Sequence, residues 1–185
     1  MKYVNSVCNY SGKFFELYTD KCITDTGKEV NWERCSRKNN IKAVMIVPYH
    51  IDLQKFVMIS EYRIPIRSKE IGFPAGLIDK PNESIEEVIR RELKEETGLD
   101  LVKILTISPF VYSTAGMTDE SIAIAYVQVN GEPSKNFLQE TEEITTFMVS
   151  KEQLANLLKY NNANWGAKAW IICNNIVNPN PFNIE

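Results

Sequence analysis

Three glutamates, Glu92, Glu95 and Glu96, form the group of side chains with the clearest capacity for chemistry in this sequence. Nothing in residues 85–96, which contain them, breaks a helix. At about 100° per residue, a helix places the three acids on the same side as its apolar residues. These apolar residues are Ile85, Val88, Ile89 and Leu93. The carboxylates are therefore expected to face inward and, at spacings of i, i+3 and i+4, to converge.

Inward-facing carboxylates that converge repel one another and lose hydration. A hard divalent cation with oxygen ligands relieves both penalties, and Mg²⁺ or Mn²⁺ suits such a site best. The alternative is a solvated acidic face with lysine partners, which is the usual explanation of a glutamate-rich helix. It requires the acids to lie opposite the apolar stripe, whereas the helical phase puts them beside it. The pattern therefore predicts a Mg²⁺ or Mn²⁺ site.

Both ends of this helix carry recognisable signals. Ser84 is placed as an N-cap, and Glu87, three residues later, can complete a capping box. Glu86 and Glu87 lie in the first turn, where the helix dipole favours negative charge. Gly98 stands where a left-handed C-cap residue is expected.

The residues around the glutamates resemble the Nudix box of the Nudix hydrolase family. That pattern has a glycine, five residues, a glutamate, seven residues and then R-E-U-x-E-E-x-G-U, where U is apolar. Here Gly76 and Glu83 precede RELKEETGL at residues 91–99. Six residues separate Gly76 from Glu83, and the extra one falls in the turn-forming run 79–82. The rest of the match is complete, and Arg91 with Glu83 resembles the family's internal ion pair that orients the acids.

The resemblance implies hydrolysis of a nucleoside diphosphate linked to another moiety. Water attacks phosphorus in this reaction, while metal ions clamp the phosphate oxygens. Glu92 and Glu96 are implied as metal ligands and catalytic residues, with Glu95 beside them. The backbone carbonyl of Ala75 is a further implied ligand, because Gly76 after it allows close approach.

Residues before the box narrow the resemblance. The run FPAGLID at residues 73–79 resembles the entry to the box in ADP-ribose and ADP-sugar diphosphatases. The tripeptide EYR at residues 61–63 resembles the Q-Y-R strand end of the same group. Arg63 is therefore expected to bind a substrate phosphate as a fork, and Arg67 is a second candidate for that task. The alternative for each arginine is a plain surface position.

A loop after the box resembles the S-P-G loop of those enzymes, which has an acidic end. It spans residues 112–120, YSTAGMTDE. Glu120 matches the loop glutamate that acts as general base or holds the attacking water. This loop is expected to be free and mobile without substrate and to close over bound substrate, and Gly116 within it is predicted to bind substrate. ADP-ribose-directed members usually have proline at the position of Ala115, which leaves the substrate open. Glu142 and Glu143 are expected at the surface, and contact with a metal or a water is the alternative.

Composition indicates a soluble globular protein with one substantial core, since 44% of the 185 residues are hydrophobic and 24% are charged. The net charge of −3 provides no general basic field, so no nucleic-acid partner is expected. The sequence contains no run of 18 apolar residues, so no membrane span is expected. The first 13 residues lack the apolar core of a signal peptide. The four cysteines show no CxxC spacing, which favours a reducing, cytoplasmic location.

The remaining elements are predicted from apolar runs and from alternation. Strands are expected at residues 41–47, 56–62, 104–112, 121–129 and 145–149, and further helices at residues 151–160 and 167–176. Residues 48–52, including His50, the only histidine, are expected in a loop. This order predicts an α/β fold, an α/β/α sandwich around a mixed β-sheet. The resemblance implies the Nudix-type form of the same sandwich.

Residues 1–40 predict two or three short strands separated by turns. They are expected to form a small N-terminal β extension to a Nudix hydrolase domain at residues 41–185. By resemblance to related diphosphatases, this extension exchanges or packs across a homodimer. The alternative is that it lengthens the central sheet.

Together these features predict a metal-dependent Nudix hydrolase that most resembles the ADP-ribose and ADP-sugar diphosphatases. ADP-ribose would yield AMP and ribose 5-phosphate, and other nucleotide sugars are the close alternative. A house-cleaning hydrolase of nucleoside triphosphates or dinucleotides is a second option, against which the run 73–79 and Arg63 argue. A non-catalytic Nudix-fold ligand-binding module is a third option, although the box is intact. An isomerase on this fold needs an acid/base cysteine, and no cysteine lies near the box.

Overall fold

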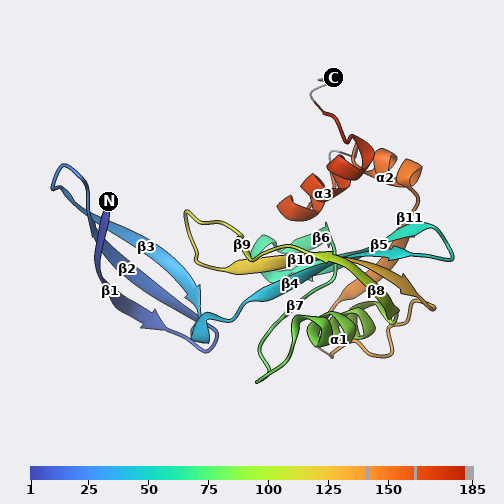
Figure 1. Cartoon of the computed structure of the whole chain (residues 1–185), viewed down its shortest axis with the longest axis horizontal. Helices are drawn as coiled ribbons and strands as arrows, with labels where there is room; N and C mark the ends of the chain where they lie inside the picture. Colours follow the sequence, from blue (N-terminus) through green and yellow to red (C-terminus); the bar gives the residue numbers. More distant parts are fainter. Residues whose placement is uncertain (141, 161, 182–185) are drawn as a thin grey trace.

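The computed structural model describes residues 1–140, 142–160 and 162–181, and these form two β-sheets and three α-helices (Figure 1). The strands are β1 Lys2–Ser11, β2 Phe15–Ile23, β3 Glu29–Arg37, β4 Ala43–His50, β5 Lys55–Arg63, β6 Ser68–Gly72, β7 Ala75–Leu77, β8 Asp100–Ile107, β9 Val111–Tyr112, β10 Ser121–Asn130 and β11 Ile144–Val149. The helices are α1 Ile85–Thr97, α2 Lys151–Leu157 and α3 Ala167–Val177, with 3-10 turns at Lys38–Asn40 and Ile64–Ile66.

The larger sheet is mixed and lies between two helical layers. Its main path runs β11-β5-β4-β10-β8, with β6, β7 and β9 paired to β5, β4 and β10. The β4–β10 pair is parallel, and the remaining pairs are antiparallel. Helix α1 covers one face, and α2 and α3 cover the other (Figure 1). This is the α/β/α sandwich that the sequence predicts.

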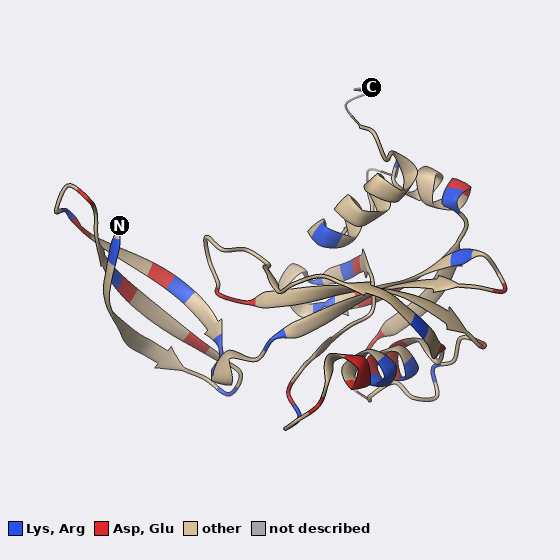
Figure 2. Ribbon diagram, in the orientation of Figure 1, with Lys and Arg blue, Asp and Glu red and all other residues tan. Residues whose placement is uncertain are grey.

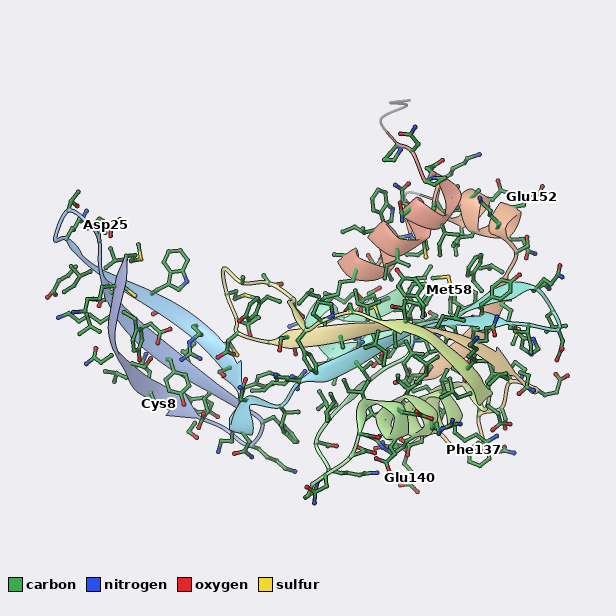
Figure 3. All side chains as sticks on the ribbon, viewed as in Figure 1. Cys8, Asp25, Met58, Phe137, Glu140 and Glu152 are labelled. Atoms are coloured by element: carbon green, nitrogen blue, oxygen red, sulfur yellow. The ribbon has the colours of Figure 1, made fainter. Side chains whose placement is uncertain are left out.

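Strand β4 shows why a sandwich follows from the sequence. Its run is apolar throughout because both of its faces are covered. Val44 and Ile46 belong to the core that includes α1, whereas Val47 belongs to the core that includes α2 and α3. Met58 of β5 is fully buried in this second core (Figure 3).

The expected boundaries of two strands are wrong. Residues 48–50 were expected in a loop, but β4 continues through His50 because β10 offers it a parallel ladder up to Val129. His50 is buried, and its Nε2 lies 2.9 Å from the carbonyl oxygen of Gly131. The single strand expected at residues 104–112 is instead divided into β8 and β9, with Pro109 in the break.

The end signals of α1 act as predicted. Ser84 Oγ accepts a hydrogen bond from the backbone N–H of Glu87 at 3.3 Å, and Glu87 Oε2 accepts one from the N–H of Ser84 at 2.7 Å. Gly98 ends the helix with a φ of 78°. Helix α2 has a similar capping box at Ser150, but it ends three residues before the expected Tyr160.

Strands β1, β2 and β3 form a separate antiparallel sheet that extends away from the sandwich (Figure 1). The alternative that residues 1–40 lengthen the central sheet is therefore wrong. This N-terminal sheet contacts the loop between β9 and β10, where the N–H of Cys35 donates to the carbonyl of Met117 at 3.0 Å. The contact places β3 beside the loop that carries Glu120.

Among the described residues, no helix has both the length and the hydropathy that crossing a membrane requires. All four cysteines are free thiols, and Cys173 is buried in the core beneath α3.

Candidate active site

Helix α1 buries two of its three predicted site acids. Glu92 and Glu96 retain 8% and 7% of their accessible surface, so they lie on the inner face, as the helical phase predicts. Glu95 is more open, with 29% of its side chain exposed. The inner pair is therefore the part of the trio that loses most hydration.

Strand β7 presses directly against these acids. A Cβ atom at Gly76 would lie 1.9 Å from Glu92 Cδ and Oε1, so only glycine lets the backbone pass the carboxylate. The backbone N–H of the preceding Ala75 donates to Glu96 Oε2 at 3.2 Å. Gly76 of β7 and the acids of α1, which are far apart in the box, are thus in contact where the strand packs on the helix.

Arg91 holds the outer side of the same group. Its Nε and Nη2 bind the Glu83 carboxylate at 2.9 and 3.1 Å, and Nη1 lies 2.5 Å from Glu92 Oε1. The same Nη1 is 3.5 Å from Glu95 Oε2. This is the orienting ion pair that the resemblance implies, and it fixes one oxygen of Glu92.

Burial dominates the electrostatics of the inner acids. Loss of hydration raises the pKa of Glu92 to about 7, although Arg91 opposes this, and Glu95 and Glu142 add to the rise. Burial also raises the pKa of Glu96 well above its usual range, and the charges of Glu92 and Glu61 contribute. Without a cation, Glu96 therefore favours its protonated form near neutral pH, whereas Glu92 exchanges its proton close to neutral pH.

Two further acids act on this group, and sequence analysis assigned neither of them to it. Glu61 at the end of β5 and Glu142 before β11 both contribute negative charge at Glu96. Burial raises the pKa of Glu61 as well. For Glu142 a surface position was favoured over contact with a metal or a water, but the pairing of β11 with β5 brings it within electrostatic reach of the α1 acids. No local pattern signals that pairing.

The donor set suits a hard divalent cation, because it consists of buried carboxylate oxygens beside a backbone that approaches closely. In the described residues, however, no three acidic, histidine or cysteine side chains surround a common point. One oxygen of Glu92 is held by Arg91, and one of Glu96 by the N–H of Ala75. Each of these two carboxylates keeps a second oxygen, outside these two contacts, that is available to a cation.

The Glu120 loop is attached to the N-terminal sheet rather than standing free, which was not expected. Arg37 Nε binds Glu120 Oε1 at 2.7 Å. Asp119 Oδ2 accepts hydrogen bonds from Arg34 Nη1 at 2.6 Å and from Ser36 Oγ at 3.0 Å. Burial alone would raise the pKa of Glu120, but Arg37, Ser113 and Lys168 together outweigh burial and lower that pKa, so this carboxylate is ionised at neutral pH.

Gly116 lies at the outer side of this loop. Its carbonyl accepts a hydrogen bond from Trp32 Nε1 at 3.1 Å, so it faces β3. A small cavity of about 260 Å³ opens between β3 and the loop and is lined by Trp32, Arg34 and Ala115. Gly116 is not among the residues that line the larger cleft described next.

A cleft of about 450 Å³ joins several predicted site residues. It is lined by Ala75 and Gly76, which touch the α1 acids, and by Glu120 and Arg63. Arg37, which sequence analysis did not single out, also lines it. Arg67, which follows the Ile64–Ile66 turn in a left-handed conformation, does not line it.

Arg63 is held at the cleft by two carboxylates. Its Nη1 lies 2.8 Å from Glu61 Oε1, and its Nε lies 3.1 Å from Glu70 Oε2. Nearly half of its side chain, 46%, remains exposed. The guanidinium is therefore oriented by its partners while keeping donors free toward solvent.

Gly76→Ala is expected to displace Glu92, because its methyl group would occupy the space of that carboxylate. The free energy of unfolding should fall by about 1–3 kcal/mol, as for other overpacked sites. Urea denaturation measures this change, and isothermal titration with Mn²⁺ should show weakened binding. Gly72→Ala is the matched control, since nothing lies within 4 Å of its added Cβ. Equal stability of both variants would contradict the contact.

Comparison with known proteins agrees with this arrangement. The family model for the NUDIX domain matches residues 40–171. A putative nudix hydrolase 2 from Caenorhabditis elegans is 35% identical over 103 residues, which cover 53% of this chain and 46% of that protein. The ADP compounds hydrolase NudE of Escherichia coli (strain K12) is 43% identical over 83 residues, or 42% of this chain and 43% of that protein. The chain thus matches less than half the length of these two relatives.

Two further matches extend over most of the chain. An ADP-ribose pyrophosphatase of Bacillus subtilis (strain 168) is 26% identical over 151 residues, which cover 81% of this chain and 78% of that protein. A crystal structure of an ADP compounds hydrolase superposes with a TM-score of 0.76 at 26% identity. That superposition covers 93% of this chain and 92% of the other.

Proposed function

The chain belongs to the Nudix hydrolase family, and from this premise we propose that it hydrolyses a nucleoside diphosphate linked to another moiety. ADP-ribose or a related nucleotide sugar is the proposed substrate. The observation that carries the proposal is the cleft in which Arg63 and Glu120 flank Ala75 and Gly76, the two residues that touch the α1 acids. A diphosphate bound in this cleft would lie beside the guanidinium of Arg63, the ionised carboxylate of Glu120 and the proposed cation site.

The cation of this proposal is Mg²⁺ or Mn²⁺, held by Glu92 and Glu96 with the carbonyl of Ala75 and assisted by Glu95. When bound, it neutralises charge on the phosphate oxygens. Arg91 keeps Glu92 oriented, since it is anchored by Glu83 at 2.9 and 3.1 Å.

The chain's other residues position substrate and move a proton. The guanidinium of Arg63 donates two N–H groups to a phosphate, as its fork geometry favours. Glu120 accepts the proton of the attacking water as the water oxygen bonds to phosphorus and the bridging P–O bond breaks. Its lowered pKa keeps it ionised and ready to do so. Glu142 is the second candidate for this proton, because its charge acts on Glu92 and Glu96.

A substrate panel tests the proposed function. ADP-ribose, other nucleoside diphosphate sugars, dinucleotides and nucleoside triphosphates should be incubated with the protein in Mg²⁺ and in Mn²⁺. We expect the highest kcat/KM for ADP-ribose or a nucleotide sugar, with AMP as one product. Preferred hydrolysis of triphosphates would replace this proposal with the house-cleaning alternative. Tight binding of a nucleotide without turnover in either metal would indicate a ligand-binding module.

Arg63→Ala is expected to lower kcat/KM by about 30- to 150-fold, or 2–3 kcal/mol, because it removes a charge-assisted phosphate contact. Steady-state kinetics with the best substrate of the panel measures the loss. Arg90→Ala is the control, since Arg90 also binds a carboxylate, that of Glu86, but on the exposed side of α1. Arg67→Ala in parallel tests the other predicted arginine. Unchanged kinetics for Arg63→Ala would remove Arg63 from the site.

We also propose that residues 1–40 form an extension that contacts a second copy of the chain, and that residues 41–185 form the hydrolase domain. The N-terminal sheet exposes large apolar side chains, including Tyr3, Val7 and Tyr10, which supports a contact of this kind. Sedimentation equilibrium of the whole chain tests the dimer, and a monomer at micromolar concentration would exclude it. Cytoplasmic location remains part of the proposal, supported by the free thiols.

A further inference from the structure

The start of α3 is fixed against the edge of the central sheet. The N–H of Ile71 in β6 donates to the carbonyl of Asn164 at 2.8 Å, and the N–H of Gly166 donates back to the carbonyl of Ile71 at 3.0 Å. Asn164 Nδ2 donates to Ser68 Oγ at 2.9 Å and to the carbonyl of Lys69 at 3.2 Å. Residues 164–166 therefore continue the sheet by a short pairing and set the position of the first turn of α3.

This first turn forms one wall of the cleft. Gly166, Ala167, Lys168 and Ala169 all line it, together with Arg63 and Gly76. In Figure 2 the single blue band of α3 lies at the helix end that is nearer the sheet. Lys168 is the only basic residue of this helix, and its charge reaches far enough to lower the pKa of Glu120. Lys168 thus lines the cleft close enough to Glu120 for the two charges to interact.

Each charged residue that lines the cleft forms an ion pair with another lining residue, except Lys168. Arg37 is paired with Glu120 at 2.7 Å, and Arg63 is paired with Glu70 at 3.1 Å. Lys168 makes no ion pair and no side-chain hydrogen bond with any residue in the described part of the chain. A cation without a partner in a concave site attracts anionic ligands, because the surrounding protein weakens solvent screening. The ligand most strongly attracted would carry clustered negative charge.

We propose that Lys168 binds a phosphate of the substrate and so sets affinity for the diphosphate, an inference that rests on the proposed function of this cleft. Arg63 and Lys168 then grip the diphosphate from two sides. The contact is made to the intact substrate and persists in the transition state. Loss of Lys168 should therefore raise KM while kcat stays unchanged.

The test compares Lys168→Met with wild type and with Lys151→Met. Methionine keeps the length and the packing of the side chain but removes its charge. Lys151 is the matched control, because it lies in the first turn of α2, is exposed, and does not line the cleft. We expect Lys168→Met to raise KM, and the Kd for ADP in EDTA, by roughly tenfold. Lys168→Arg should restore both values, and Lys151→Met should match wild type.

The two measurements separate this inference from the proposed function. Equal Kd and KM for Lys168→Met and wild type would overturn the role of Lys168 while the hydrolase remains. If no compound of the panel is hydrolysed but Lys168→Met still weakens ADP binding, the hydrolase proposal fails and the phosphate contact stands. A wild-type protein that does not bind ADP at millimolar concentration overturns the contact itself. A fall in kcat without a change in KM or Kd also contradicts it.

Discussion

Glu96→Gln is expected to lower kcat/KM on the order of 10³-fold in Mg²⁺, because the cation that Glu96 is proposed to hold would supply several kcal/mol of charge stabilisation. Glutamine keeps the size of the side chain and its ability to accept the hydrogen bond from Ala75. It removes the negative charge that a divalent cation requires. Kinetics at saturating Mg²⁺ and titration with Mn²⁺ should both show the loss.

The same substitution is expected to stabilise the metal-free protein above about pH 6. Burial raises the pKa of Glu96 above its unfolded value, so the folded state binds more protons and stability falls as pH rises. Glu92, with a pKa of about 7, adds to the same trend. Glutamine at position 96 removes the cost of a buried charge, and the melting temperature in EDTA should rise by several degrees at pH 8.

Thermal unfolding of the wild type and of Glu96→Gln in EDTA, at pH 5 and pH 8, tests the direction of this stability change. The difference between them should be small at pH 5, where Glu96 is protonated, and large at pH 8. Glu86→Gln is the control, since Glu86 lies on the exposed side of α1. If Glu96→Gln and Glu92→Gln both keep near-normal rates in Mg²⁺, the assignment of the cation site is wrong.

Glu120→Gln is expected to lower kcat by about 10²- to 10⁴-fold, as removal of a general base typically does. KM and affinity for Mn²⁺ should change little, because Glu120 is not a predicted ligand of the cation. The carboxylate is ionised and lines the cleft, but Arg37 holds one of its oxygens at 2.7 Å. Pre-steady-state kinetics with the best substrate isolates the hydrolytic step from product release.

Two neighbouring acids decide whether Glu120 is the base. Asp119→Asn should have a mild effect, because Asp119 faces Arg34 and Ser36 of β3 instead of the cleft. Glu142→Gln tests the acid that lies before β11. A severe loss for Glu142→Gln with a mild one for Glu120→Gln would move the base to Glu142. If neither variant is impaired, the base lies inside the box, and Glu95 becomes the candidate.

The sequence by itself determined the elements that carry local periodicity. Ser84, Glu87 and Gly98 mark the ends of α1 because caps act over three or four residues. The inward direction of Glu92 and Glu96 follows from 3.6 residues per turn, which fixes a face once the apolar stripe is known. The order of strands and helices likewise predicts the α/β/α sandwich, because each apolar face of the sheet must be buried against another element.

Only the tertiary structure decided which distant groups meet in the cleft. Arg37 and Glu120 are separated by 83 positions, and their contact depends on how the N-terminal sheet lies against the loop. Sequence analysis therefore expected a free loop and missed Arg37. For the same reason Lys168 was missed and a surface position was favoured for Glu142, because strand pairing and the Asn164–Gly166 junction bring them to the site. Periodicity determines the face of an element, whereas long-range packing determines what that face meets.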